Sequence, residues 1–386
     1  MHHNFRPAKT SPDGRPIYAA LDLGTNNCRL IIAEKSSGRH SKKLTPSQPY
    51  RVVDAFSRIV RLGEGLASAG RLSNEAMDRT IAALAICARK MGKRGVTHPM
   101  CITTEACRRA ENCDDFIKMV SSETGIRLRI ISGDEEARLG LIGCTSLLDK
   151  KKKHALIFDI GGGSTEISWL GLGDNGQFEI LATLSIPFGV VTLTERFGGQ
   201  FDETLDDGGH LSRCAYQTIV AEVLERLSEF NAAHSIQSAV DEGTVQMIGT
   251  SGTVTTLVGI HLRMKRYDRS RVDGTYMSFN QIGNLTNQLG KLSNSARADN
   301  ACIGRHRADL VMPGCAILEA ICEQWPLGQL RIADRGLREG MLFRLMNNRR
   351  SESKSQNSKP NKNKRRRNRS RRKPSGAGNA ATQASQ

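Results

Sequence analysis

The chain has 386 residues, of which 38% are hydrophobic and 25% charged, with a formal net charge of +17. This length is sufficient for two domains with a sizeable core. Its ten cysteines form no Cys-x-x-Cys pair and lie mostly in apolar stretches. That pattern is typical of buried thiols in a reducing compartment and argues against a zinc site. No stretch is apolar enough for a transmembrane helix and no signal-peptide pattern is present, so we expect a soluble, cytoplasmic protein without a membrane partner.

The positive charge is concentrated near the C-terminus. Residues 349–373 contain thirteen Lys or Arg against one acidic residue, a local charge of +12 that leaves about +5 for the remainder. This stretch has no aromatic residue and almost no apolar one, so it cannot form a core. We therefore expect residues 349–386 to be a disordered basic tail. The polar residues 1–15 are expected to be a disordered N-terminus.

The first expected element is a β-hairpin over residues 17–33. An apolar run leads to Asp22, breaks at Gly24-Thr25-Asn26, and resumes as a second apolar strand. An apolar strand on each side of a short polar break is the pattern of a hairpin. The turn therefore begins two residues after an acidic residue.

The rest of the first half alternates short apolar runs, which predict strands, with apolar residues at helical spacing, which predict helices. We expect, in chain order, a strand near 51–56, a helix at 76–91 with Ser73 as its N-cap, a strand at 99–104, a helix at 114–124 and a strand at 127–131. This alternation is typical of a layered α/β domain, which we assign to residues 16–149.

A second hairpin is expected over residues 155–168. An apolar run leads to Asp159, and an alternating strand that carries Glu166 follows the turn. The turn residues are Gly161, Gly162, Gly163 and Ser164. Three successive glycines allow backbone N–H groups to converge on one phosphate oxygen. The two carboxylates beside the turn are what a divalent cation would require.

The second domain is assigned to residues 154–346, after a lysine run that we interpret as a solvated hinge. Beyond the hairpin we expect a strand at 179–184, a helix around 210–230, a strand at 246–248, a turn at 249–253 and then mainly helices. The turn contains Gly252 and Thr253. Two interpretations of it stay open: a third phosphate loop, or a strand-to-helix turn with a hydroxyl cap.

Two hairpins of the same architecture indicate a duplicated domain whose turns face a shared cleft. On these hairpins the chain resembles the acetate kinase, sugar kinase, Hsp70 and actin superfamily. Within it the chain resembles the exopolyphosphatase and guanosine pentaphosphate phosphohydrolase (Ppx/GppA) family. The family segments are, in order, the two hairpins, Ser132-Gly133-Asp134-Glu135-Glu136-Ala137, the turn at 249–253 and Gly336-Leu337-Arg338-Glu339-Gly340.

The resemblance implies a fold and a reaction. The implied fold is α/β and two-lobed, with duplicated RNase H-like domains around a central cleft, in a short form without the C-terminal HD-type domain. The implied reaction is attack of water on the terminal phosphorus of polyphosphate or guanosine pentaphosphate, with release of orthophosphate. This reaction depends on charge neutralisation and an in-line water more than on covalent chemistry.

Two residues carry the expected catalytic roles. The resemblance assigns the water-activating base to Glu136, with neighbouring Glu135 as the rival, because adjacent helical residues diverge by roughly 100° and only one can face the cleft. Nearby acids are expected to raise the pKa of the base. Arg108 matches the family arginine that clamps a phosphate and offsets transition-state charge.

The remaining site residues are expected to bind phosphate or metal. By resemblance, phosphate binds to the amides and hydroxyls of Gly24, Thr25, Asn26, Gly161, Gly162, Gly163, Ser164, Gly252 and Thr253. The expected cofactor is Mg²⁺ or another divalent cation, which prefers oxygen ligands. Its carboxylates are expected to be Asp22, Asp159 and Glu166, directly or through water.

Several alternatives stay open. We favour polyphosphate over guanosine pentaphosphate, because a basic tail can hold a long polyanion by counterion release. The same tail could contact RNA, and a homodimer is one option for the oligomeric state. Two more distant alternatives are a kinase of the same superfamily, which would need a second substrate, and a nucleic-acid-binding protein without phosphatase activity.

Overall fold

A computed structural model of the chain describes residues 4–9, 14–35, 50–197 and 211–357. Residues up to Met346 form one compact unit, and the chain from Asn347 onwards forms a second one. The strands are β1 Ile17–Leu23, β2 Asn27–Lys35, β3 Tyr50–Ile59, β4 His98–Thr103, β5 Arg129–Ile130, β6 His154–Ile160, β7 Thr165–Leu172, β8 Phe178–Ile186, β9 Val245–Thr250, β10 Tyr276–Ser278 and β11 Gln329–Ile332.

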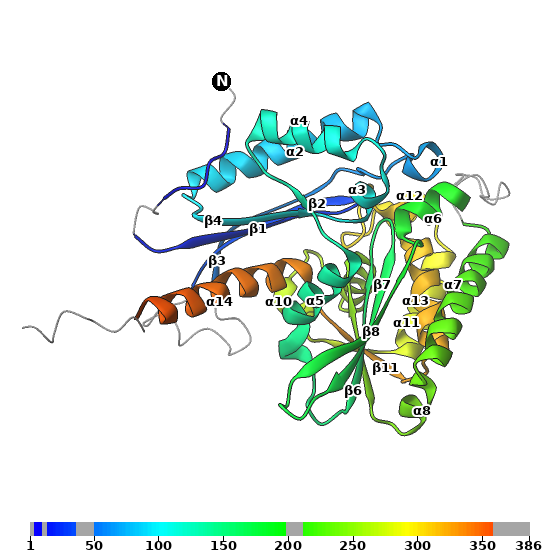
Figure 1. Ribbon diagram of the computed structural model, residues 1–386. Helices are drawn as coiled ribbons and strands as arrows, with labels where there is room; N and C mark the ends of the chain where they lie inside the picture. Colours follow the sequence, from blue (N-terminus) through cyan, green and yellow to red (C-terminus); the bar gives the residue numbers. More distant parts are fainter. Residues whose placement is uncertain (1–3, 10–13, 36–49, 198–210, 358–386) are drawn as a thin grey trace, which may run out of the picture. The chain divides into compact units, whose positions relative to one another are not determined.

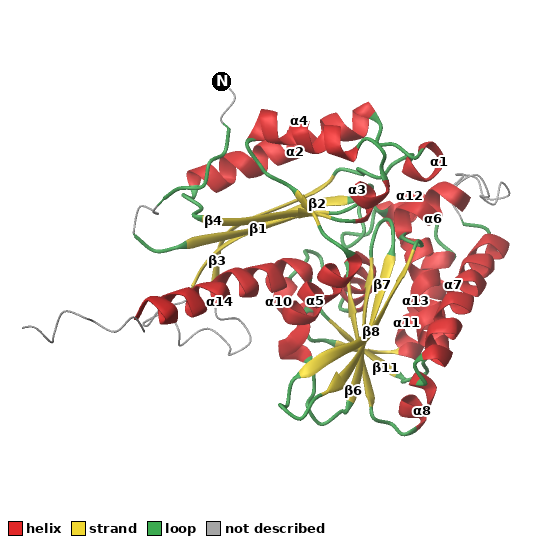
Figure 2. Ribbon diagram, in the orientation of Figure 1, coloured by secondary structure: helices red, strands yellow, loops and turns green. Residues whose placement is uncertain are grey.

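Helices separate and follow these strands (Figure 2). They are α1 Leu66–Ala69, α2 Asn74–Lys93, α3 Glu105–Arg109, α4 Cys113–Thr124, α5 Gly133–Cys144, η2 Thr145–Leu147, α6 Val190–Phe197, α7 Arg213–Ala233, α8 Ile236–Asp241, α9 Gly252–His261, α10 Arg269–Val272, α11 Phe279–Gly290, α12 Asn294–Ala298, η3 Ala308–Leu310, α13 Val311–Gln324 and α14 Leu337–Asn357. The helix expected at 76–91 is α2, and the Ser73 hydroxyl accepts a hydrogen bond from Ala76 N at 3.2 Å, as a cap does.

Two mixed sheets share one topology, which confirms the expected duplication. The first has the order β3-β2-β1-β4-β5, and the second has β8-β7-β6-β9-β11 followed by β10. In each sheet the first two strands form a hairpin, and the third strand pairs antiparallel with the second. The first strand of the hairpin also pairs in parallel with a later strand, β1 with β4 and β6 with β9. The fold is therefore the duplicated, two-lobed α/β arrangement that the sequence indicated.

Helices cover both faces of the first sheet (Figure 1). Alternate β1 residues Ala19, Leu21 and Leu23 pack with the apolar faces of α2 and α4. The intervening residues Tyr18 and Ala20 pack with α5 and with the first turns of α14. Because both faces are buried, β1 is apolar throughout instead of alternating, and Asp22 interrupts it only at its end.

The second sheet has a larger core on one face. Leu156, Phe158 and Ile160 of β6 pack there with α6, α7, α9 and α13. Ala155 and Ile157, which point to the other face, pack with Cys144 and Leu147 at the end of α5 and in η2. A helix from the first half therefore supports the opposite face of the second sheet.

The chain differs from the expectations at its C-terminal end. Helix α14 extends to Asn357 and so includes residues 349–357, which were expected to belong to the disordered tail. Its buried residues Met341, Leu342 and Met346 pack against the first sheet, although the sequence assigned residues up to 346 to the second domain. The expected disordered N-terminus is also wrong in part: Phe5 is buried in the core of the first sheet, and its amide donates a hydrogen bond to the carbonyl of Thr124 at 2.8 Å. Residues 1–3, 10–13 and 358–386 of the two expected disordered ends lie outside the described residues. Within the part of the chain that is described, no helix has the length and hydropathy needed to cross a bilayer.

Candidate active site

The turn after β1 is fixed from outside the hairpin. Its closing hydrogen bond runs from Gly24 N to Asn27 O at 2.9 Å. The carbonyl of Asn26 accepts hydrogen bonds from Val60 N at 2.8 Å and from Arg61 N at 3.0 Å, and the carbonyl of Thr25 accepts one from Gly63 N. With its carbonyls held by the segment after β3, the turn presents a defined set of amides and side chains.

The turn after β6 is closed in the same way, by Gly161 N and Ser164 O at 2.9 Å. The carbonyls of Gly161 and Gly162 accept hydrogen bonds from the first amides of α6. A Cβ on Gly189 would lie 2.4 Å from the carbonyl of Gly162. Because these glycines have no side chain, the segment before α6 can pack closely against the turn.

The two turns meet. A Cβ on Gly162 would lie 3.0 Å from Asn26 Cβ, and one on Gly163 would lie 2.7 Å from Thr25 Oγ1. No acceptor in the described part of the chain is bonded to the amides of Gly162 and Gly163, which leaves them able to donate to an anion. The sequence predicted the two turns separately, and the tertiary structure brings them together.

Four carboxylates gather around these turns. Burial raises the pKa of Asp22, with Arg29 and Arg338 opposing the rise and Asp159 adding to it. Burial likewise raises the pKa of Asp159. It raises the pKa of Glu166 well above its usual range, and the charges of Glu136 and Asp159 add to that rise. Such like-charged carboxylates in a desolvated site favour bound protons or a bound cation.

Glu136 has the strongest signs of a general base. Burial raises its pKa to about 7, Arg108 opposes the rise, and the charges of Asp22 and Asp159 add to it. Its carboxylate accepts a hydrogen bond from Arg108 Nη1 at 2.8 Å. A carboxyl with a pKa near neutrality is well matched to accept a proton from water.

Arg108 is held by acceptors on three sides. Its Nε and Nη2 bind Glu105, and its Nη1 binds Glu136 and the carbonyl of Ile131. A guanidinium has five N–H donors, so one remains available to a phosphate oxygen. Glu111, the other acid of this segment, pairs with Arg71 at 3.5 Å and leaves Arg108 to Glu105 and Glu136.

The rival residue Glu135 is turned away from the carboxylates. It accepts hydrogen bonds from Arg129 at 2.7 Å and from Arg344 at 2.6 Å. These arginines lower its pKa to about 2. The sequence predicted that one of the two adjacent acids would face the site. The acids that raise the pKa of Glu136 are Asp22 and Asp159, not its neighbour in the chain.

The turn between β9 and α9 combines features of both interpretations. Thr250 lies beside Asp159 in the parallel register of β9 and β6, so the turn begins at the carboxylate cluster. The Ser251 hydroxyl accepts a hydrogen bond from Thr253 N at 3.3 Å and so caps α9. Gly252 and Thr253 thus form a capped helix N-terminus next to Asp159, a position where a phosphate is also stabilised.

One expected phosphate donor has a different partner. The Ser164 hydroxyl donates a hydrogen bond to Glu166 Oε1, which also accepts one from Ser185 at 3.4 Å. Ser164 therefore orients a carboxylate in this structure. The side-chain oxygen Oδ1 of Asn26 is buried without a hydrogen-bond partner in the described part of the chain. An orphaned acceptor beside the two turns fits a site that takes up a further polar group or cation.

Three further arginines lie in or near the site, and no role was predicted for them from the sequence. Arg29 lies opposite Asp22 in the hairpin register. The charge of Arg338 acts on Asp22, and burial lowers the pKa of Arg338 itself. Arg307 is close enough to Arg29 for their charges to interact, and its own pKa is lowered. Arg338 lies in the family segment 336–340, but no local signal places it or Arg307 near the acids.

The carboxylates of the site suit a hard cation, but they are not arranged around a metal position in this structure. The expected ligands Asp22, Asp159 and Glu166 all supply carboxylate oxygen, the type that Mg²⁺ prefers. Among the described residues, no group of three or more His, Cys, Asp or Glu is arranged as a metal site. These residues therefore fit a cation that keeps water in its coordination shell, as Mg²⁺ does.

Comparisons with known proteins converge on one family. The model of the Ppx/GppA phosphatase family matches residues 41–349. A bifunctional 3-dehydroquinate synthase/phosphatase of Fusobacterium nucleatum is 30% identical over 311 residues, which is 80% of this chain and 43% of that protein. Exopolyphosphatase 2 of Mycobacterium tuberculosis is 28% identical over 336 residues, or 85% of this chain and 98% of that protein.

The fold comparison agrees with the topology. The crystal structure of an exopolyphosphatase from Cytophaga hutchinsonii matches with a TM-score of 0.72 and 22% identity, over 86% of this chain and 98% of that one. At this identity the likeness concerns the fold. The chain spans less than half of the Fusobacterium protein but nearly all of the Mycobacterium one.

Proposed function

This chain belongs to the Ppx/GppA phosphatase family, and we propose that it releases the terminal orthophosphate of inorganic polyphosphate by attack of water. Membership makes it a hydrolase of phosphoanhydride bonds. The observation that carries the proposal is Glu136, whose pKa of about 7 and contact with Arg108 occur beside two glycine turns. The likeness to an exopolyphosphatase over nearly its full length supports this choice of substrate.

We propose that a carboxylate oxygen of Glu136 accepts the proton and that the two turns bind the phosphate. Glu136 accepts a proton from the attacking water, which becomes the new oxygen of orthophosphate. Amides of Gly162 and Gly163, with those of Thr25 and Asn26, donate to the terminal phosphate and orient it for in-line attack. The remaining donor of Arg108 neutralises charge that develops on the phosphate oxygens.

A divalent cation is part of this proposal. Asp22, Asp159 and Glu166 would hold it, in part through water, and their raised pKa values indicate an environment that favours added positive charge. Bound Mg²⁺ would supply charge neutralisation at the phosphates. Ser164, through its hydrogen bond to Glu166, orients one of these carboxylates.

The test is phosphate release from long-chain polyphosphate and from guanosine pentaphosphate, measured side by side with excess Mg²⁺. We expect faster turnover of polyphosphate and loss of both activities in Glu136→Gln. Guanosine pentaphosphate 5′-phosphohydrolase is the alternative, and a higher kcat/KM for that substrate would establish it. Full phosphate release by Glu136→Gln would show that the base lies elsewhere.

The basic tail is proposed to hold the distal part of a long substrate. Residues 358–386 contain ten Lys or Arg and no acidic residue, and such a segment binds polyanions by counterion release. Truncation after Asn357 leaves α14 complete, and we expect it to weaken binding of long polyphosphate more than of short chains. Equal effects on both lengths would contradict the proposal. RNA binding that the full chain shows and the truncated chain lacks would indicate RNA as the partner of the tail.

A further inference from the structure

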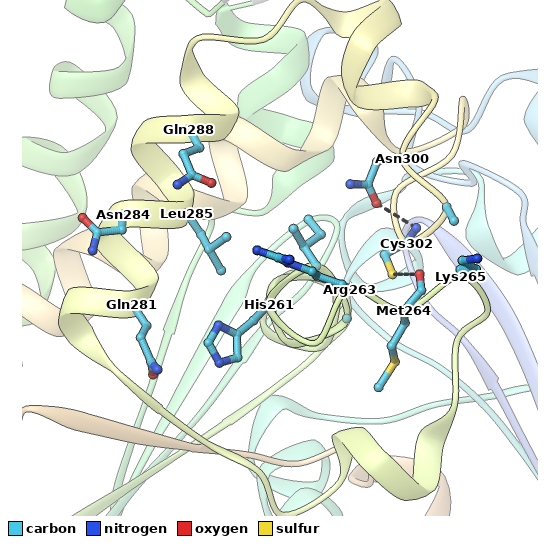
Figure 3. Close-up of a pocket in the computed structure, with 13 residues that line it drawn as sticks. His261, Arg263, Met264, Lys265, Gln281, Asn284, Leu285, Gln288, Asn300 and Cys302 are labelled. Atoms are coloured by element: carbon cyan, nitrogen blue, oxygen red, sulfur yellow. Dashed lines mark hydrogen bonds between the residues drawn. The ribbon is translucent and has the colours of Figure 1, made fainter.

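A cavity of about 600 Å³ lies in the second half of the chain, at the end of α9 (Figure 3). Its walls are the C-terminal end of α9 with the following loop, one side of α11, and the segment 300–302. Small-molecule sites have volumes of roughly 300–1,000 Å³. None of its lining residues belongs to the carboxylate cluster or to the glycine turns.

The polar lining is basic on one side and rich in carboxamides on the other. His261, Arg263 and Lys265 come from the α9 end, and no acidic residue lines the cavity. Gln281, Asn284 and Gln288 come from α11. Figure 3 shows Arg263 and His261 between the end of α9 and the helix that carries these carboxamides. Cations suit phosphate groups, and carboxamides suit the donors and acceptors on the edge of a nucleobase.

Arg263 has an unusual backbone and no fixed partner. Its φ is +48°, in the left-handed region where glycine or asparagine normally ends a helix. Its amide closes the helix end on the carbonyl of Ile260 at 2.9 Å. Arg263 is exposed, and no hydrogen bond or ion pair of its guanidinium occurs within the described residues. A favourable interaction with the helix dipole would account for basic residues here, but not for the facing carboxamides or the open volume.

We propose that this cavity binds a nucleotide, with the base against Asn284 and Gln288 of α11 and the phosphates against Arg263 and Lys265. The site is separate from the catalytic one. Helix α9 begins at Gly252 beside Asp159 and ends at His261 in the cavity wall. Ten residues of α-helix span roughly 15 Å. The proposal does not depend on which phosphoanhydride the enzyme cleaves.

The test is calorimetric titration of the full chain with ADP, GDP, adenosine and pyrophosphate. We expect at least one of the two nucleotides to bind, and adenosine and pyrophosphate to bind at least tenfold more weakly. Arg263→Ala is expected to weaken nucleotide binding by about tenfold or more, the effect of losing a charge-assisted contact. Arg266→Ala, which removes the same charge three residues on but outside the cavity lining, is the matched control and is expected to bind as the unchanged protein does.

Two further measurements keep the outcome decisive. Gln288→Leu is expected to weaken nucleotide binding while leaving pyrophosphate binding unchanged, and phosphate release by Arg263→Ala is expected to equal that of the unchanged protein. Absence of binding by both nucleotides, equal losses in Arg263→Ala and Arg266→Ala, or pyrophosphate binding as tight as that of the nucleotides would overturn the proposal. So would displacement of the nucleotide by long polyphosphate, because that would locate it in the catalytic site.

Discussion

Glu135 and Glu136 are adjacent carboxylates with opposite environments. Glu135 lies between two arginines, and its pKa is lowered to about 2. Glu136 lies among buried acids, and its pKa is raised to about 7. Ser132 starts α5 by accepting a hydrogen bond from Glu135 N at 3.2 Å, and this start fixes the direction of each residue on the helix. The identity of the base therefore depends on the residue at which α5 begins, because this sets which of the two glutamates faces the site.

Replacement of the base tests this assignment. Glu136→Gln keeps the size of the side chain but cannot accept a proton, so we expect kcat to fall by about 10²–10⁴-fold. Glu135→Gln is the matched control and is expected to retain most of the activity. The measurement is phosphate release from polyphosphate with both variants at equal concentration. A similar loss in the two variants would show that α5 as a whole, not Glu136, is required.

The pH profile follows from the pKa of about 7 for Glu136. Only the deprotonated carboxylate can accept the proton, so kcat/KM is expected to be constant above pH 7 and to fall tenfold per unit below it. The profile is measured at constant ionic strength and extrapolated to low Mg²⁺, because a bound cation lowers the pKa of a nearby carboxylate. An apparent pKa near 4.5, the ordinary value for Glu, would contradict a buried base.

At the scale of elements, α5 is held by its close approach to the start of α14. A Cβ on Gly340 would lie 1.9 Å from the carbonyl oxygen of Leu139, and one on Gly143 would lie 2.0 Å from that of Gly336. Two glycines thus let the backbones touch where α5 passes the segment that carries Arg338. This contact joins the helix of the base to a helix that begins just after the second sheet.

We expect Gly340→Ala to be costly because the added methyl group would meet backbone, which cannot move aside. Overpacking of this kind costs about 1–3 kcal/mol, and displacement of α5 is expected to lower activity as well. Gly140→Ala is the control, since a Cβ there meets no atom within 4 Å, and a helical alanine is more stable than glycine by up to about 1 kcal/mol. Thermal unfolding of both variants gives the comparison.

The Glu135 cluster is expected to make stability depend on pH. The folded pKa of about 2 lies below the ordinary 4.5, so the stabilisation is complete above pH 4.5 and is lost as the pH falls toward 2. Because Arg129 and Arg344 are 52% and 42% exposed, we expect only about 1 kcal/mol. Glu135→Gln should remove this dependence in urea unfolding between pH 5 and 3. The more exposed pair of Arg71 and Glu111 supplies the control, with little effect expected from Glu111→Gln.

At the scale of the compact unit, contacts between distant segments join the two halves. Arg61, after β3, binds Asp309 in η3 at 2.9 Å. The amide of Gly65 donates to Glu195 of α6 at 2.8 Å. Since Arg61 also anchors the first turn through its own amide, the same short segment positions the turn and contacts the second half.

The Arg61 and Asp309 pair is expected to contribute modestly to stability. Its side chains are 31% and 26% exposed, so a double-mutant cycle of Arg61→Ala and Asp309→Ala should give a coupling of about 0.5–1 kcal/mol. The measurement is the free energy of urea unfolding of the two single variants and the double variant. Additive losses would show that the pair is merely a surface contact.

The sequence by itself determined the hairpins, their duplication and the order of the family segments. The spacing of apolar residues, the glycines of the turns and the acid before each turn are signals that can be read within a few residues of the chain. The segment containing Glu136 and the segment containing Arg108 were also recognisable locally. Only the tertiary structure decided that Asp159 raises the pKa of Glu136, that the charges of Arg29 and Arg338 act on Asp22, and that α14 returns to the first sheet. These relations join residues far apart in the chain, and burial and charge act through space rather than along the sequence.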